Sequence, residues 1–394
     1  MWYFNSPQII FGEGALSFLE TLTGQRAFIV TDATLQKLGF AERICQALEP
    51  TGMQVQVFAE VEPDPSLHMV TRGAGVMSAF APDWIIALGG GSVMDAAKAM
   101  WVLYERPDIF AEAINPIEVL GLRKKARLVA IPTTTGTGSE ATWAIVLTDT
   151  AEKRKLGLGN RETMPDYAVL DPEMVANQPA RLIADTGLDA LTHAVEGFTT
   201  TFHHDFSDGP CLVAAKLVLE HLPRAVADND SDALARLQNA ATIAGMGFGN
   251  AMAGLAHGMG HALGGVFHVP HGRAVALFLP YTIEYCGNEA ALADGAAGPT
   301  RYAGLNRFLG LACDNEAQAA SALVRAIRDL QAQVGQPRTI AELGIPRADF
   351  ERELDLLVAN ALNDSQTVMA TRVPENDDLR RLFLAAYDGN PIDF

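Results

Sequence analysis

Short runs of β-branched and apolar residues alternate with helical patterns through the first half of the chain. Apolar residues at spacings of three and four, as in Leu35–Leu48 and His68–Phe80, are typical of helices that bury one face. Strands that alternate with helices favour a parallel sheet covered by helices on both faces. We therefore expect an α/β domain over residues 1–179. The four runs that we predict to be its buried strands are Arg26–Thr31, Gln54–Phe58, Trp84–Leu88 and Arg127–Ile131.

The pattern changes at about Pro179, where clear strand signals end and segments rich in alanine and leucine begin. Helical periodicity is clearest in Thr186–Phe198, Pro210–Leu222 and Leu234–Leu263. The last segment is apolar nearly all round, which indicates a buried helix or a pair of buried helices. The sequence therefore predicts an all-α domain over residues 180–394.

Composition and charge disfavour several classes of partner. With 49% hydrophobic and 19% charged residues, the 394-residue chain can bury a large core and does not have the composition of a disordered protein. A net charge of −18 disfavours binding to nucleic acid or to an anionic membrane. The four cysteines form no CxxC pair, the first ten residues lack the regions of a signal peptide, and no apolar run has membrane-spanning length. We therefore expect a cytoplasmic protein that binds neither nucleic acid nor membrane.

A glycine cluster, GGGS from Gly89 to Ser92, lies between the predicted strand Trp84–Leu88 and a helical run that contains Asp95 and Lys98. Glycines at such a turn let the backbone approach a phosphate closely, and the helix N-terminus adds free N–H donors. Taken alone, the cluster is explained equally well by a plain tight turn.

A second polar loop, PTTTGTGSE from Pro132 to Glu140, follows the next predicted strand. Its four threonines and one serine place hydroxyl groups and backbone amides at the carboxyl end of that strand, where open α/β sheets bind their ligands. An ordinary polar surface loop is the alternative. Two such loops after consecutive strands favour a pyrophosphate site, so we predict that the α/β domain with its parallel sheet binds a dinucleotide.

Asp32 lies at the end of the predicted strand Arg26–Thr31. A carboxylate in this position can accept a hydrogen bond from an adenosine ribose 2′-OH and would repel a 2′-phosphate, which favours NAD over NADP. The alternative is a helix N-cap for the segment that follows, a position that aspartate favours.

The histidines of the second half carry the strongest indication of chemistry. Asp189 and His193 are four residues apart, so they share one face of a helix, and His257 and His261 have the same spacing. With His271 they offer one carboxylate and several imidazoles from separate helices, a set that suits Fe(II) or Zn(II). A single histidine of this kind is more often a hydrogen-bonded core residue. Burying so many imidazoles is costly unless each is paired, so the whole set favours a metal site.

Other histidines carry no such indication. His203 and His204 stand beside Asp205 among polar neighbours and have no helical spacing, which indicates a solvated turn. His68 and His221 are interpreted as ordinary surface or core residues.

The chain resembles the iron-containing (group III) alcohol dehydrogenase family over nearly its full length. The most specific matches are GLDALTHAVEGF from Gly187 to Phe198 and GLAHGMGHALGGVFHVPHG from Gly254 to Gly272. In the first half, the matching motifs are FGEGAL at Phe11–Leu16, IVTD ending at Asp32, GGGSVMDAAK at Gly89–Lys98 and PTTTGTGSE at Pro132–Glu140.

The resemblance implies a function and a set of site residues. It implies an oxidoreductase that interconverts a primary alcohol or diol and its aldehyde, with hydride transfer to or from NAD(H) and Fe2+ or Zn2+ polarising the substrate oxygen. The metal ligands of the family match Asp189, His193, His257 and His271. Its cofactor contacts match Asp32, Gly89, Gly90, Gly91, Ser92, Thr133, Thr134 and Thr137, with Asp95 and Lys155 as further candidates.

The resemblance also assigns two catalytic-site residues. His261 matches a family histidine near the nicotinamide that is not a metal ligand, and Phe248 matches an aromatic residue that lines the substrate pocket. A non-ligand imidazole in this place suits the relay of the alcohol proton to solvent. The family further implies a homodimer or a larger oligomer.

Two residues depart from the family pattern. Asp64 stands between two prolines where many relatives have asparagine, so that particular cofactor contact is not carried over. His268, three residues before His271, is not part of the pattern.

The sequence also allows three rival functions. A zinc polyol dehydrogenase like glycerol dehydrogenase and a lyase like dehydroquinate synthase share the architecture. The helical half is poor in lysine, which disfavours the phosphorylated acid substrate of the lyase. The rival from another class is a metal-dependent nucleotide sensor without turnover.

Overall fold

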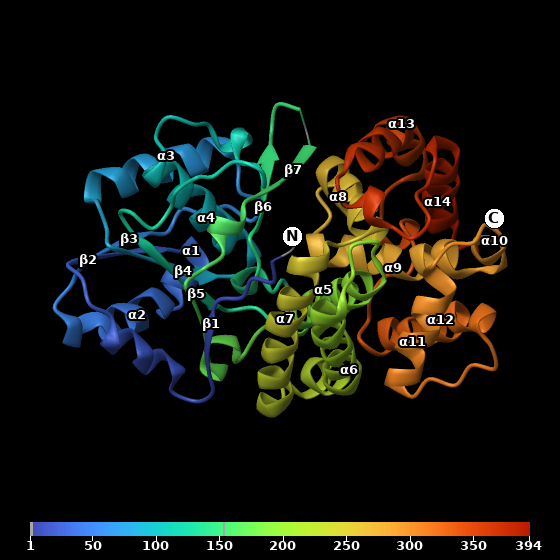
Figure 1. Ribbon diagram of the computed structural model, residues 1–394, viewed down its shortest axis with the longest axis horizontal. Coiled ribbons are helices and arrows are strands. Elements are labelled where there is room, and N and C mark those ends of the chain that lie inside the picture. The colour runs from blue at the N-terminus through green and yellow to red at the C-terminus, as the bar shows by residue number, and fades with distance from the viewer. Residues whose placement is uncertain (1–2, 153) are drawn as a thin grey trace. The chain divides into compact units, whose positions relative to one another are not determined.

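The computed structural model describes residues 3–152 and 154–394, and the chain divides into two compact units, Met1–Gln178 and Pro179–Phe394 (Figure 1). The first unit contains a six-stranded parallel sheet in the order β1-β8-β5-β4-β2-β3. The described residues of the second unit form helices and contain no strand. The predicted fold class, a parallel α/β unit followed by an all-α unit, is confirmed.

The strands of the first unit are β1 (Gln8–Phe11), β2 (Arg26–Val30), β3 (Gln54–Phe58), β4 (Trp84–Gly89), β5 (Arg127–Pro132), β6 (Ala144–Asp149), β7 (Arg154–Gly159) and β8 (Tyr167–Leu170). Its helices are α1 (Ala33–Lys37), α2 (Phe40–Leu48), α3 (Leu67–Phe80) and α4 (Gly91–Glu105).

Both faces of the parallel sheet are buried, as the apolar strand sequences require. Along β2, Phe28 and Val30 belong to the core beneath α3 and α4. Their neighbours Ala27 and Ile29 belong to a second core beneath α2 and the short 3-10 helix Ala15–Thr21. The parallel pairing of β4 with β5 places their carboxyl ends side by side, with Gly89 opposite Pro132.

The four predicted strands are confirmed, but four further strands were not predicted. β1 and β8 have only four residues each and extend the sheet at one edge. β6 and β7 form a separate antiparallel hairpin. The short length of β1 and β8 leaves too few alternations for a periodicity signal.

The segment Leu35–Leu48, which has helical spacing, is covered by two helices rather than one. They are α1 and α2, and the chain breaks between them because Gly39 adopts a left-handed backbone conformation with φ of 82°. This conformation ends the first helix, and glycine adopts it without a steric penalty.

The helices of the second unit contain the predicted helical segments. Leu234–Leu263 is a pair of helices, because the chain turns between α7 and α8 at Met252, whose φ is 72°. None of the described helices is long and apolar enough to span a membrane. The helices are α5 (Ala180–Thr199), α6 (Asp205–Asp228), α7 (Ser231–Ala251), α8 (Leu255–Phe267), α9 (His271–Gly287), α10 (Glu289–Ala293), α11 (Gly298–Leu309), α12 (Glu316–Gln333), α13 (Arg347–Asn363) and α14 (Asn376–Asp388).

Candidate metal centre and nucleotide loops

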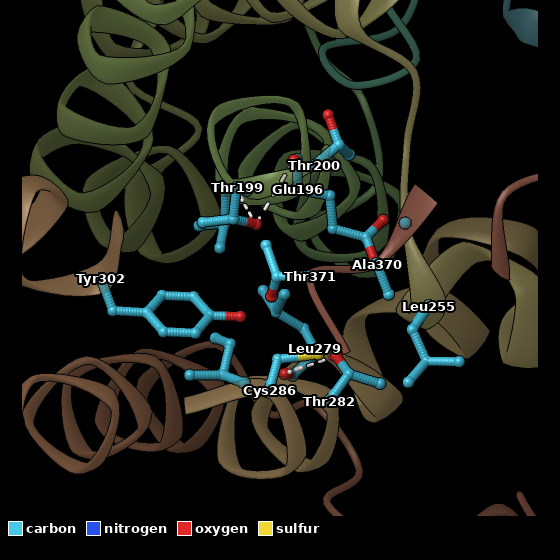
Figure 2. Close-up of a pocket in the computed structure, with 13 residues that line it drawn as sticks. Glu196, Thr199, Thr200, Leu255, Leu279, Thr282, Cys286, Tyr302, Ala370 and Thr371 are labelled. Carbon is cyan, nitrogen blue, oxygen red and sulfur yellow. Dashed lines mark hydrogen bonds between the residues drawn. The ribbon is translucent and has the colours of Figure 1, made fainter. Parts of the chain in front are cut away.

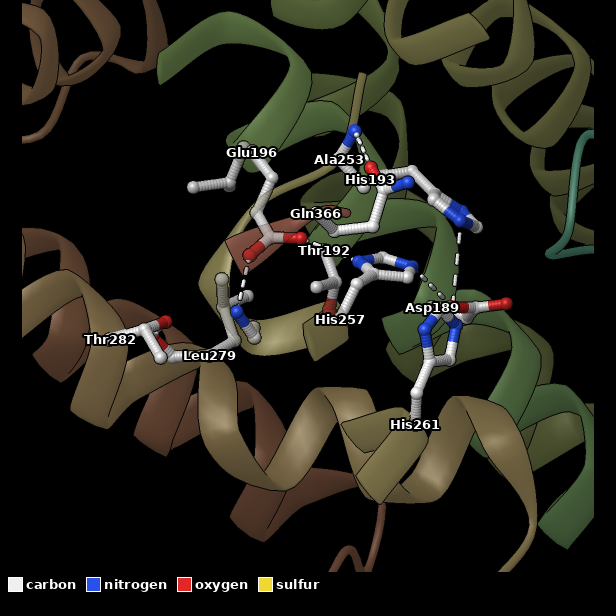
Figure 3. A network of polar contacts seen from close by, with 12 residues as sticks. Asp189, Thr192, His193, Glu196, Ala253, His257, His261, Leu279, Thr282 and Gln366 are labelled. Atoms are coloured by element: carbon white, nitrogen blue, oxygen red, sulfur yellow. Dashed lines mark hydrogen bonds and ion pairs between the residues drawn. The ribbon is translucent and has the colours of Figure 1, made fainter. Parts of the chain in front are cut away.

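The structure brings together the four residues that the sequence predicts as metal ligands. Asp189 and His193 lie one turn apart on α5, His257 lies on α8, and His271 opens α9. One ligand atom from each of the four lies within 4.8 Å of the others. Figure 3 shows how Asp189, His193 and His257 converge.

The distances within this cluster are equal to or slightly longer than those between ligand atoms around a tetrahedral ion. Asp189 Oδ1 is 3.8 Å from His257 Nε2, 3.6 Å from His271 Nε2 and 3.9 Å from His193 Nδ1. These contacts are too long for hydrogen bonds. Ligand atoms around a tetrahedral ion, with bonds of about 2.0–2.2 Å, are separated by roughly 3.3–3.6 Å.

Burial without hydrogen bonds is the second sign of a ligand site. Asp189 Oδ1 and His257 Nε2 are buried and have no hydrogen-bond partner among the described residues. Burial raises the pKa of Asp189 well above its usual value, and the charges of Glu196 and Asp185 add to this shift. Buried polar atoms are nearly always paired, so these two atoms fit a bound cation.

Close packing between α5 and α9 holds the cluster in place. A Cβ on Gly272 would lie 2.5 Å from the carbonyl oxygen of Asp185, so only glycine allows this approach. The guanidinium of Arg273 donates to both carboxylate oxygens of Asp185 at 2.7–3.0 Å. Asp185 lies one turn before Asp189, and Arg273 lies two residues after His271. This buried ion pair therefore holds both candidate ligands in position.

Glu196 contacts the metal cluster but was not predicted. Its Oε2 lies 2.5 Å from Nδ1 of His257, and its Oε1 accepts from the backbone N–H of Ala256 at 2.6 Å. Glu196 follows Asp189 by seven residues and His193 by three, so all three share one face of α5. That spacing is the sequence signal that could have identified it.

His261 lies next to the cluster with a carboxylate partner of its own. Its Nδ1 is 2.8 Å from Oδ2 of Asp364, and its Nε2 is buried without a hydrogen-bond partner in the described chain. Its ring stacks on His271 with centroids 5.3 Å apart. Burial favours a raised pKa for Asp364, but the charge and hydrogen bond of His261 outweigh burial and lower it. Asp364 was not predicted either.

The other predicted residues of the second unit lie around or outside this cluster. Phe248 on α7 stacks on the ring of His193, with centroids 3.9 Å apart and planes 9° apart. His204 caps α6: its Nδ1 accepts from Ser207 N at 3.2 Å, and Ser207 Oγ accepts from His204 N at 3.0 Å. His204 is thus a half-buried cap at the turn, and His268 ends α8 with φ of 56°.

The two predicted nucleotide loops of the first unit touch each other. A Cβ on Gly90 would lie 3.0 Å from Cγ2 of Thr134, and a Cβ on Gly91 would lie 2.9 Å from Cγ2 of Thr137. The Thr133 N–H donates to the carbonyl of Gly89 at 3.0 Å. The glycines therefore let the threonine loop pack directly against the N-terminus of α4.

Asp95 and Lys98 of α4 hold the end of the threonine loop. Lys98 Nζ, fully buried, donates to the carbonyl of Ser139 at 2.7 Å and to that of Ala144 at 3.0 Å. Asp95 accepts from Ser139 Oγ at 2.7 Å and from Val146 N at 2.9 Å. Burial lowers the pKa of Lys98 to about 8, although the charge of Asp95 opposes this shift.

The remaining cofactor candidates have partners within the first unit. Asp32 caps α1, because its Oδ1 accepts from Thr34 N at 2.8 Å and from Leu35 N at 2.9 Å. Lys155 Nζ forms an ion pair with Asp64. The Ser92 hydroxyl donates to the carbonyl of Pro63. Asp32 is therefore the N-cap of α1, as the alternative interpretation of the sequence expected.

A small cavity lies behind Glu196 in the second unit (Figure 2). Its lining includes Thr199, Cys286 and Tyr302, and none of the four cluster residues lines it. Its volume of about 20 Å3 has room for one water molecule, for which about 10–15 Å3 is needed. The cavity is too small for an alcohol substrate.

Known proteins resemble this chain in sequence and in fold. Residues 6–172 match the sequence profile of iron-containing alcohol dehydrogenase, and residues 183–387 match that of the C-terminal part of the Fe-containing alcohol dehydrogenase family. The NADPH-dependent butanol dehydrogenase of Clostridium saccharobutylicum is 37% identical over 100% of both chains. The bifunctional aldehyde-alcohol dehydrogenase AdhE of Escherichia coli is 38% identical, over 99% of this chain and 46% of its own. An iron-containing alcohol dehydrogenase structure from Thermococcus thioreducens superposes with a TM-score of 0.89 at 31% identity, covering 99% of this chain and 100% of its own.

Proposed function

Since the chain belongs to the iron-containing alcohol dehydrogenase family, we propose that it interconverts a short primary alcohol or diol and its aldehyde with NAD and a divalent metal. The family and the relatives make the chain an oxidoreductase that acts on alcohols. The choice of NAD, the metal and its ligands, and the assignment of the cofactor to the first unit and the metal to the second are the proposal.

The observation that carries this proposal is the cluster of Asp189, His193, His257 and His271. One carboxylate and three imidazoles form a donor set that suits Fe(II) and Zn(II). The buried Oδ1 of Asp189 and Nε2 of His257 have no other partner among the described residues, so the cluster fits a cation. The name of the family favours iron, and zinc is the alternative.

The residues around the cluster have separate parts in the reaction. When bound, a divalent ion supplies Lewis acidity toward the substrate oxygen, and the nicotinamide supplies a hydride acceptor. Because the Asp364 carboxylate accepts from Nδ1 of His261, the lone pair of this imidazole is on Nε2. His261 Nε2 then accepts the proton of the alcohol while the substrate carbon loses its hydride. Phe248 holds the ring of His193 in place and lines the substrate side.

The touching loops of the first unit suit the pyrophosphate of a dinucleotide. Gly89, Gly90, Gly91 and Ser92 place it at the N-terminus of α4, where free N–H groups favour an anion. Thr133, Thr134 and Thr137 add donors from the adjacent loop, and Lys155 adds a positive charge. Asp95 contributes by holding Ser139 of that loop.

Asp32 is the basis for proposing NAD rather than NADP. Its carboxylate at the end of β2 would repel a 2′-phosphate. The relative from Clostridium saccharobutylicum is described as NADPH-dependent, so the preference of this chain is a separate question from its family. Steady-state kcat/KM with each cofactor measures it, and equal values would contradict the proposal.

We further propose a cytoplasmic homodimer, or a larger oligomer of dimers, with no nucleic-acid or membrane partner. The family resemblance supports the oligomer, and the charge of −18 supports the lack of anionic partners. Sedimentation equilibrium of the full chain tests the oligomer, and a monomer at micromolar concentration would contradict it.

A substrate panel on defined metal forms tests the proposed function. Protein purified without oxygen is stripped of metal, reloaded with Fe2+ or Zn2+, and assayed with short alcohols and diols for NADH and NADPH formation. We expect NADH formation that depends on the metal. Cofactor binding without turnover on any alcohol would instead support a sensor, and the proposal would be wrong.

A further inference from the structure

α8 carries two histidines, and each has a carboxylate at its Nδ1. His257 contacts Glu196 at 2.5 Å, and His261, one turn later, contacts Asp364 at 2.8 Å. Both histidines have a buried Nε2 without a hydrogen-bond partner in the described chain. Only His257 belongs to the four-residue metal cluster. A histidine with a carboxylate at its Nδ1 thus occurs twice on α8, once within the four-residue cluster and once beside it.

We infer that Glu196 is a positioning residue for the metal ligand His257. A carboxylate only accepts hydrogen bonds, so Glu196 fixes the proton of His257 on Nδ1 and leaves the lone pair on Nε2. This Nε2 faces Oδ1 of Asp189 at 3.8 Å, on the side of the cluster. The inference rests on the proposed metal site and assigns a further residue to it.

The backbone around Glu196 limits where its carboxylate can lie. Oε1 accepts from Ala256 N in the first turn of α8, where the helix dipole favours a negative charge. A Cβ on Gly254 would lie 3.0 Å from Oε1, so the glycine leaves space for the carboxylate. The other carboxylate oxygen, Oε2, contacts Nδ1 of His257, and Figure 3 shows the side chains of Glu196 and His257.

The burial of Glu196 also favours this assignment. The residue is only 5% exposed, so both carboxylate oxygens need partners inside the protein, and Ala256 N–H and His257 Nδ1 provide them. A positioning carboxylate of this kind raises the basicity of the imidazole ligand, and losing it typically costs 10–100-fold in metal affinity.

The test compares Glu196→Gln with Asp364→Asn. A glutamine has a single acceptor oxygen, so it satisfies Ala256 N–H or His257 Nδ1–H but not both. We measure the Kd of Zn2+ for the metal-free protein by chelator competition, and the Tm of the metal-free protein. We expect the Kd of Glu196→Gln to rise by about 10–100-fold. The Kd of Asp364→Asn stays unchanged, because its histidine is not a ligand.

Two outcomes would overturn the inference. One is an unchanged Kd in Glu196→Gln together with a lower Tm of the metal-free protein, which would make Glu196 only a cap for α8. The other is an equal loss of affinity in Asp364→Asn, which would show that any change along α8 perturbs the site. If Glu196→Gln does not fold, Glu196→Asp replaces it, since shortening by one methylene breaks one of the two contacts, and the same rise in Kd is expected.

Failure of the proposed metal site gives a different result. The unaltered protein would then bind no Zn2+, or would bind it with the same Kd in Asp189→Asn. Loss of binding in Asp189→Asn with an unchanged Kd in Glu196→Gln would contradict the role of Glu196 alone.

Discussion

The two units of the chain bury charged groups in opposite ways. In the first unit, the buried Lys98 and the half-buried Asp95 form hydrogen bonds with Ser139, Ala144 and Val146. In the second unit, the buried Oδ1 of Asp189 and Nε2 of His257 lack a hydrogen-bond partner in the described chain. A buried polar group without a partner is costly, which supports the proposal that the second arrangement binds a cation.

We therefore propose different roles for the two clusters: the first positions a loop, and the second binds a cation. The Lys98–Asp95 cluster satisfies itself and holds a loop whose outer groups can contact a cofactor. In the Asp189 cluster, the packing and the Asp185–Arg273 ion pair hold the candidate ligand atoms 3.6–3.9 Å apart, too far for hydrogen bonds, and we propose that a cation lies among them. Variants in the first cluster should therefore lose stability and cofactor binding, and variants in the second should lose metal binding.

The largest effect is expected for His271→Ala. It removes one of the four candidate ligands, so we expect loss of metal retention and a fall of roughly 10³-fold in kcat/KM, because a Lewis acid contributes several kcal/mol. Metal analysis and steady-state rates measure both. His204→Ala is the control: it removes the cap of α6, lowers stability by about 1 kcal/mol and keeps the metal. The reverse pattern would show that the ligand assignment is wrong.

The next largest effect is expected for Lys98→Met. It leaves the half-buried Asp95 without its cation, so the free energy of unfolding of the first unit should fall by about 3 kcal/mol and cofactor binding should weaken. Metal content should not change. Urea unfolding, cofactor titration and metal analysis are compared with those of Lys37→Met, whose lysine is exposed. Loss of metal in Lys98→Met would show that the two clusters are not independent of each other.

The pH dependence of the free energy of unfolding tests the lowered pKa of Lys98. Burial lowers the pKa of Lys98 to about 8, whereas a lysine of the unfolded chain titrates near 10.5. Between these values the unfolded chain binds the extra proton, so this lysine makes stability rise with pH from about 8 to 10.5. Lys98→Met should lack that part of the slope in unfolding curves. An identical slope in both proteins would contradict the shifted pKa.

A smaller effect is expected for His261→Ala. If His261 accepts the alcohol proton, kcat should fall by about 10²-fold while metal content and NAD binding stay unchanged. The pH–rate profile of the variant should lose the ionisation that this imidazole contributes. A raised KM for NAD with an unchanged kcat would instead mean that His261 only contacts the cofactor.

The smallest effect is expected for Asp32→Gly. Glycine at an N-cap costs only a few tenths of a kcal/mol, so stability should hardly change even though the Thr34 and Leu35 contacts are lost. The preference for NAD over NADP, measured as a ratio of kcat/KM values, should narrow or reverse. An unchanged ratio would leave Asp32 with its capping role alone.

Local spacing predicted most of the fold, whereas the choice of the four candidate ligands came from the family resemblance. Apolar runs located four strands of the sheet, and the i, i+4 spacing located Asp189 with His193. Glu196 has the same local signal but is of a residue type that ordinarily faces solvent. Asp364 has no local signal, because it lies 103 residues after His261 and only the fold brings them together.

The break at Gly39 and the strand β1 escaped prediction for physical reasons. Gly39 interrupts a helical pattern through its backbone conformation, although the apolar spacing continues across it. β1 has four residues and is identified by its pairing with β8, which lies far along the chain. Periodicity reports which face of an element is buried, and it does not report which distant segment covers that face.

The metal site itself is tested most directly by Asp189→Asn, with the Tm of the protein measured without metal and with saturating Zn2+. Removing a carboxylate that burial disfavours should leave the metal-free Tm equal or higher. The unaltered protein should gain stability on adding Zn2+, about 4 kcal/mol at a thousand times the Kd, and the variant should gain none. An equal gain in both proteins would contradict a metal held by Asp189 and its three histidines.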